Sequence, residues 1–184
     1  MLNEVSVLQL PGQQGDWFPA DGRRQQHPAP ARVHQLRKAV YHLWEGGAEP
    51  AVRGAIYGED AIIKNEHEIT DYKYTNYVYE IESHVDAPKF VFRTTGSNMY
   101  GKISMLVGLN QDVYYNEFAL VDVYLIIDEQ TYASTLEENY IDPLNEGTRD
   151  LYDVNCGATY GAKLVRDMVE DAKTAAFDIY KRIY

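Results

Sequence analysis

The sequence predicts an α+β or α/β fold, with a mainly antiparallel mixed sheet covered by an N-terminal and a C-terminal helix. Residues 72–127 are rich in Tyr, Val, Ile, Phe and Thr, which suit a pleated, half-buried surface. Residues 31–45 and 158–183 instead repeat apolar side chains every three or four positions, as amphipathic helices do. A chain of 184 residues is long enough for one core. We therefore expect residues 31–184 to form a single domain, preceded by an extended N-terminal arm of residues 1–30.

The arm of residues 1–30 is rich in Pro, Gly and Gln, a composition that cannot build a core of its own. Its apolar side chains at Leu8, Leu10, Trp17 and Phe18 are the candidates for holding it against another surface. The pair Trp17 and Phe18 buries much apolar area at low entropic cost. Two alternatives remain open for this pair: it caps the protein's own core, or it docks on a neighbouring subunit.

The first predicted helix lies between Pro30, which suits a helix start, and Gly46, which suits a helix stop. The segment after it, residues 51–65, predicts one or two short strands interrupted by Gly58. The apolar stripe of the predicted helix is Val33, Leu36, Val40, Leu43 and Trp44.

Within 72–127, alternation assigns side chains to two faces of the sheet, and both faces need cover. Residues 96–98 and 110–112 read as turns. Asp122 interrupts an apolar strand, so we expect its carboxylate to face solvent or a partner. One face is predicted to carry Tyr77, Tyr79 and Ile81, and the other Tyr72, Tyr74 and Val78.

Residues 128–147 predict a short helix followed by a loop, because Pro143 limits helix length. The C-terminal helix is the clearest element, and Lys181 and Arg182 suit the negative end of its dipole. Its apolar stripe comprises Leu164, Val165, Met168, Ala172, Ala175, Ala176, Ile179, Tyr180 and Ile183.

The formal charge of −11 arises entirely after Lys64. Residues 110–155 hold eleven carboxylates against the single Arg149. Such a surface repels phosphate, so we expect no sequence-specific nucleic-acid binding. This acidic surface has two possible interpretations. It only keeps the protein soluble, or it lines a channel through which nucleic acid passes without binding. The candidate acidic surface is Asp112, Glu117, Asp128, Glu129, Glu137 and Glu138.

The chain has no apolar run near 18 residues and no basic segment ahead of an apolar one at its start. We therefore expect a soluble protein without membrane association, cytoplasmic when synthesised. With Cys156 as its single cysteine, it forms no internal disulfide.

Cys156, shortly before the last helix, is the one candidate nucleophile, because a helix N-terminus lowers a thiol pKa. A base would have to be a histidine, and none lies in a recognisable motif; a small buried residue is the simpler interpretation. In the run 66–68 only Glu66 and Glu68 point to the same side of a strand, which is too few ligands for a metal. We expect no catalytic residue, no metal and no cofactor.

The chain has sixteen tyrosines, more than one small core can bury while giving every hydroxyl a hydrogen-bond partner. We therefore expect many of them to lie on surfaces that contact other molecules. By analogy, a small sheet-and-helix domain with a polar arm and an acidic surface resembles ring subunits of virus particles, such as neck, connector or tail terminator proteins of tailed phages. The sequence thus predicts a non-enzymatic structural protein that assembles with itself and with neighbouring assembly proteins, inside the virion. A small-ligand-binding or regulatory domain, and a cysteine-dependent enzyme using Cys156, are the alternatives.

Overall fold

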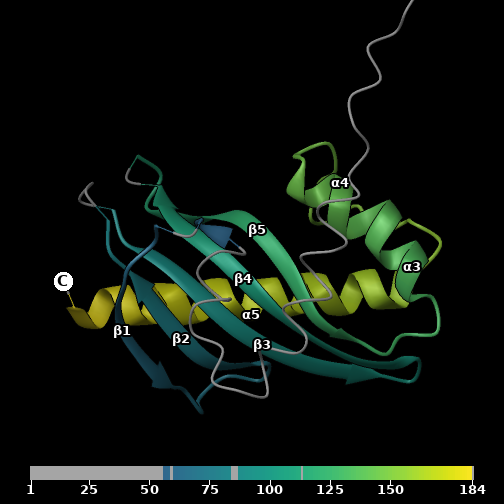
Figure 1. Cartoon of the computed structure of the whole chain (residues 1–184), viewed down its shortest axis with the longest axis horizontal. Coiled ribbons are helices and arrows are strands. Elements are labelled where there is room, and N and C mark those ends of the chain that lie inside the picture. Colours follow the sequence, from purple (N-terminus) through teal and green to yellow (C-terminus); the bar gives the residue numbers. More distant parts are fainter. Residues whose placement is uncertain (1–55, 59, 84–86, 113, 184) are drawn as a thin grey trace, which may run out of the picture.

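The computed structural model describes residues 56–183 except 59, 84–86 and 113. In this part a twisted sheet lies against one long helix, and a shorter helical segment stands beside one end of the sheet (Figure 1). The predicted arm of residues 1–30 and the predicted helix of residues 31–45 lie outside the described residues.

The sheet has five strands in the sequential order β1-β2-β3-β4-β5, and each pair of neighbours is antiparallel. Consecutive strands joined without crossovers form an α+β fold, which confirms the antiparallel prediction and replaces the α/β alternative. The edge strand β1 overlaps the segment predicted as strand, residues 51–65, only at residues 63–65, and the described residues between Ile56 and Ile62 form no strand. The strands are β1 (Ile63–Glu68), β2 (Thr75–Ile81), β3 (Lys89–Asn98), β4 (Gly101–Asp112) and β5 (Glu117–Asp128).

The helix α5 (Thr159–Ile183) covers one face of the sheet, as the sequence predicted for residues 158–183. Its predicted stripe is buried against the strands wherever the structure describes the side chain, with Tyr180 partly buried at the margin. The strand residues of this core include Val78, Phe90, Phe92, Met105 and Leu109, which are all buried.

The second face of the sheet has a smaller apolar core of Tyr79, Ile81, Val91, Leu106 and Ile126. The predicted alternation in β2 is confirmed, because Tyr79 and Ile81 lie in this core and Val78 lies in the other. The chain enters the described domain across this second face. There Ile56 lies so close over Gly108 that a Cβ on the glycine would be 2.3 Å from Ile56 Cγ2.

Both predicted turns were wrong, because the strands run further than the turn residues suggested. Residues 96–98 belong to β3 and residues 110–112 to β4. Gly96 serves close packing: a Cβ there would lie 2.9 Å from Leu164 Cδ1 of α5. Asp112 does shape the turn, but from the last position of its strand, since its Oδ1 accepts the N–H of Tyr114 at 2.9 Å.

The predicted short helix plus loop after residue 128 is a longer, continuous helical stretch. It comprises α3 (Ala133–Leu136), the π-helical η2 (Glu137–Ile141) and α4 (Asp142–Asn145). Asp142 N–H donates to the Glu137 carbonyl, five residues back, directly before Pro143. The wider π turn lets the helix pass a residue that has no N–H to donate.

The last residue of α4 fastens this helical stretch to the edge of the sheet. Asn145 Oδ1 accepts the N–H of Val123 and Asn145 Nδ2 donates to the Val123 carbonyl, both at 2.9 Å. The amide thereby supplies the two hydrogen bonds that a further strand would make at this point of β5.

Candidate functional site

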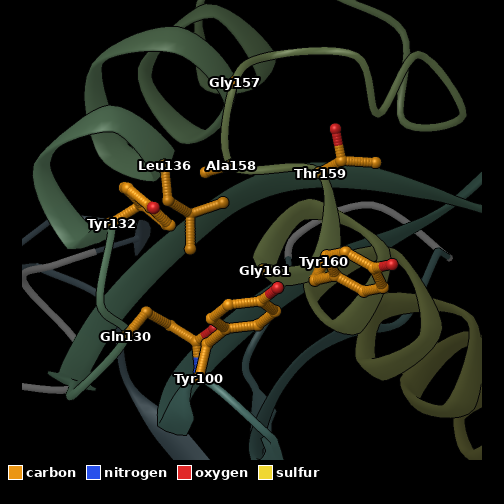
Figure 2. Close-up of a pocket in the computed structure, with 9 residues that line it drawn as sticks. All are labelled: Tyr100, Gln130, Tyr132, Leu136, Gly157, Ala158, Thr159, Tyr160 and Gly161. Carbon is orange, nitrogen blue, oxygen red and sulfur yellow. The ribbon is translucent and has the colours of Figure 1, made fainter.

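A pocket of about 250 Å³ opens at the N-terminus of α5, where three tyrosines from separate segments meet (Figure 2). The ring of Tyr100, from the β3–β4 turn, lies between Tyr132 at the start of α3 and Tyr160 in the first turn of α5. Its centroid is 6.3 Å from that of Tyr132 and 5.3 Å from that of Tyr160. The hydroxyls of Tyr132 and Tyr160 belong to exposed side chains, so the pocket is a half-open recess with aromatic walls.

Gln130 forms the polar floor of this pocket and is buried. Its Nε2 donates to the Gly101 carbonyl at 2.6 Å, while its Oε1 lies 3.5 Å from the position a Cβ would take on Gly161. Gly161 also allows Leu136 of α3 to approach, because the same Cβ would be 3.0 Å from Leu136 Cδ2. Gly161, in the first turn of α5, therefore lets the side chains of Leu136 and Gln130 pack close to the helix and shape this pocket.

Beneath Gln130 lies Asp128, one of the predicted acidic surface residues, and it is half-buried. Its Oδ1 accepts the Gln130 N–H at 2.9 Å, whereas its buried Oδ2 has no hydrogen-bond partner within the described structure. Burial raises the pKa of the Asp128 carboxyl, and the Gln130 N–H opposes that shift.

The lining of this pocket offers hydrogen-bonding groups and aromatic surface. The first N–H groups of α5 have no partner inside the helix, so they can donate hydrogen bonds to an oxygen of a ligand. Tyrosine hydroxyls and the Gln130 amide complete its polar groups, and no cationic or thiol side chain lines it. These groups suit a small neutral or weakly anionic molecule.

Cys156, the predicted alternative nucleophile, is buried and lies outside the lining of this pocket. Its carbonyl accepts the Asn139 amide at 3.2 Å, which places it beside η2, near the β5 edge of the sheet. The single described histidine, His67, is exposed on β1, at the edge of the sheet opposite β5. The cysteine-enzyme alternative thus has no geometric support in the described region, and the other four histidines lie outside it.

In the described ranges, no group of three or more His, Cys, Asp or Glu side chains lies close enough to hold a metal ion. Over the same ranges, no helix combines the length and apolar character needed to cross a bilayer.

A second recess, a groove of about 570 Å³, runs between the β4–β5 turn and α5. One wall carries Tyr115 and Glu117 from the turn, and the other carries Tyr152 and Glu170. Tyr152 donates its hydroxyl to Glu170 Oε1 at 3.0 Å, which raises the pKa of the phenol and holds the ring in place. The floor is apolar, because Phe118 and Phe177 line it.

The predicted acidic surface is divided over three places of the described domain. Asp112 and Glu117 face each other as Cα partners at the β4–β5 turn. Asp128 and Glu129 are at the other end of β5, roughly 36 Å away for a strand of 12 residues. Glu137 and Glu138 lie on η2. Whether these groups face one lumen depends on the assembly, so the acidic wall stays a prediction.

The predicted interface residues Leu8, Leu10, Trp17 and Phe18 lie outside the described residues, and their role stays a prediction. The sequence did not reveal the two places where aromatic side chains gather. Its only signal was the number of tyrosines, which carries no information on which of them meet. No family model, no curated protein and no solved structure matches this chain.

Proposed function

We propose that the chain is a non-enzymatic structural protein that assembles head to tail with copies of itself. The type of assembly we infer is a closed ring in the virion of a tailed phage, at the neck, connector or tail terminator. Neighbouring proteins of the same particle would be its further partners, after synthesis in the host cytoplasm.

The observation that carries this proposal is the position of the exposed large side chains, which gather at opposite ends of the sheet. Tyr114 and Tyr115, 96% and 77% exposed, project from the β4–β5 turn, and with Tyr152 they form the tip patch. Met99 in the β3–β4 turn, with the exposed Tyr132 and Tyr160 close by, forms the turn patch. The length of β4, 12 residues or roughly 37 Å, separates the two turns (Figure 1).

Exposed aromatic and methionine side chains are typical of protein interfaces, where their apolar area leaves water. Two different patches at opposite ends favour a heterologous contact, in which the tip patch of one copy meets the turn patch of the next. Such contacts close into a ring when the rotation between copies permits. The tip is also rigid enough for this purpose, since Asp112 Oδ1 accepts the N–H groups of both Tyr114 and Tyr115.

The sheet edges are built against the alternative contact, which is strand addition. β1 is only six residues long and carries Lys64, Glu66 and Glu68, charges of the kind that protect edge strands. At the other edge, the Asn145 amide occupies the N–H and the carbonyl of Val123 in the middle of β5. Side-chain contact between patches therefore remains the more favourable way for copies to associate.

The virion assignment is further supported by charge. All of the net charge of −11 lies after Lys64, so the body repels DNA phosphates instead of retaining them. We expect no measurable binding of the isolated protein to duplex DNA at physiological salt, in a gel-shift or anisotropy titration. Binding under those conditions would count against a channel-lining role.

The assembly is tested by sedimentation velocity and negative-stain electron microscopy on the full chain. We expect discrete oligomers that appear as closed rings, and loss of these oligomers in the double variant Tyr114→Ser/Tyr115→Ser. Ile62→Ser is the matched control, because Ile62 is also exposed but lies next to β1, away from both patches. A chain that stays monomeric up to roughly 100 µM, far above the Kd range of stable assemblies, would contradict the proposal, as would unchanged rings in the double variant.

A second candidate function, the binding of a small ligand, is favoured by the pocket at the N-terminus of α5. Its buried Gln130 amide and the first N–H groups of α5 face the same recess. A protein-observed NMR screen with small carboxylates and phenols tests it. Shifts confined to the Tyr100, Gly161 and Gln130 signals support this function, and their absence across the screen removes it.

A further inference from the structure

We infer that the groove between the β4–β5 turn and α5 is the docking site for the N-terminal arm of a neighbouring copy, with Trp17 and Phe18 as its anchors. This inference rests on the proposed self-assembly and names the surface that would be used. The groove has the size of a site for two aromatic side chains, about 570 Å³, and it is open to solvent along one side.

The chemistry of the groove matches aromatic anchors. Four of the residues that line it are aromatic: Tyr115, Phe118, Tyr152 and Phe177. Phe118 is buried and fixed, since its centroid is 5.7 Å from that of Phe90 and 6.2 Å from that of Tyr180. Aromatic rings inserted between such walls gain edge-to-face contacts beyond the area they bury.

The charges of the groove and of the arm contribute little to this fit. Glu117 and Glu170 lie on opposite walls, and Lys173 pairs with Glu170 at 3.2 Å, so one carboxylate remains in excess. On the arm, Asp16 and Asp21 flank the anchors and Arg23 and Arg24 follow them, so residues 11–26 carry no net charge. Contact between aromatic side chains therefore has to supply most of the affinity.

The position where the chain enters the domain favours the arm of another copy as the occupant. Ile56 lies over Gly108 on the second face of the sheet, whereas the groove is lined by α5 on the first face. An arm that filled its own groove would have to pass around an edge of the sheet. Phe18 precedes Ile56 by 38 residues, a length of chain that can reach the tip end of a neighbouring copy in a head-to-tail ring.

The first experiment measures arm binding without requiring assembly. The receptor is the full chain with Trp17→Ser/Phe18→Ser, which leaves its groove without its own anchors, and the probe is a fluorescent peptide of residues 11–26. We expect saturable binding by anisotropy that depends little on salt, because the peptide carries no net charge, and an affinity loss of at least about tenfold when Tyr115→Ser/Tyr152→Ser is added to the receptor. Tyr115→Phe/Tyr152→Phe is the matched control, which keeps both rings and should keep binding. A peptide with serine at both anchor positions should not bind.

The second experiment distinguishes the chain's own arm from that of a neighbour. The chain has two tryptophans, Trp17 and Trp44, so Trp44→Phe leaves Trp17 as the only reporter. We expect acrylamide quenching of Trp17 to fall as the concentration rises through the range in which oligomers form. Protection of Trp17 already in the monomer would overturn the assignment to a neighbouring copy.

Failure of the docking site and failure of the proposed function give different results. If the chain forms rings but the peptide does not bind, or binds the Tyr115→Ser/Tyr152→Ser receptor equally well, the groove assignment is wrong and the assembly stands. If the full chain never assembles, the proposed function is wrong, and so is the assignment of a neighbouring copy's arm to the groove.

Discussion

Asp171, in the middle of α5, holds the loop that leads into β2. Its Oδ2 accepts the Tyr74 N–H at 2.9 Å, the Thr75 N–H at 2.8 Å and the Thr75 hydroxyl at 2.7 Å. Its Oδ1 accepts the Lys73 N–H at 3.2 Å. One carboxylate thus satisfies four donors and connects residues 96 to 98 positions apart in the sequence.

We expect Asp171→Ala to lower the free energy of unfolding by about 3 kcal/mol. Hydrogen bonds to a charged group contribute roughly 1.5–3 kcal/mol each, but these four share one carboxylate and are not additive. The largest part of this loss comes from Thr75, which is 1% exposed. Its N–H and its hydroxyl both donate to Asp171 Oδ2, and both would lose this acceptor when the side chain is truncated. Water can replace the carboxylate at Lys73 and Tyr74, whose bonds are less buried.

The measurement is urea unfolding followed by far-UV circular dichroism, with the melting temperature as a second readout. A loss of about 3 kcal/mol corresponds to a fall of roughly 6–12 °C for a chain of this size. Asp171→Asn keeps one acceptor oxygen without the charge and should lose about half as much. The matched control is Asp167→Ala on the same helix, since the half-exposed Asp167 forms a surface ion pair with its neighbour Arg166 and its loss should cost less than about 0.5 kcal/mol. Equal stability of the Asp171→Ala and Asp167→Ala variants would refute the reasoning.

Three further changes test other parts of the structure. Tyr57→Phe should cost about 1 kcal/mol in urea unfolding, because the Tyr57 hydroxyl lies 2.9 Å from the Leu109 carbonyl and 2.7 Å from Asn110 Oδ1. Gly96→Ala should cost about 1–3 kcal/mol because its Cβ meets Leu164 Cδ1 at 2.9 Å, and less than that in a Leu164→Ala background. Asp128→Asn should be more stable than the parent at pH 7. Since burial raises the folded-state pKa of Asp128, the native state binds the proton more tightly, and the parent loses stability as pH rises from the ordinary Asp value of about 3.9 to the raised value. The gap between the two proteins should widen over that window and stay constant above it; a gap independent of pH would contradict the assignment.

Periodicity alone predicted a mainly antiparallel sheet covered by a C-terminal helix, while the choice of α+β over α/β came from the strand order of the structure. The alternation of Tyr79 and Ile81 with Val78 assigned side chains to the correct faces of β2, and the apolar stripe of α5 faces the sheet as predicted. Both patterns are local, because a strand repeats every two residues and a helix every 3.6, so the sequence displays them without any partner. The excess of tyrosines likewise indicated surfaces for contact, but not which ones.

Tertiary contacts decided what the local pattern could not. Gly96 reads as a turn residue, yet it lies inside β3, where a Cβ would press on Leu164 of α5. Asp128 reads as a surface carboxylate, yet it is half-buried under Gln130. The gathering of Tyr100, Tyr132 and Tyr160 depends on a turn, a short helix and a long helix that only the folded chain brings together. Sequence spacing encodes the face of an element on which a side chain lies, whereas packing between distant elements sets what that side chain meets.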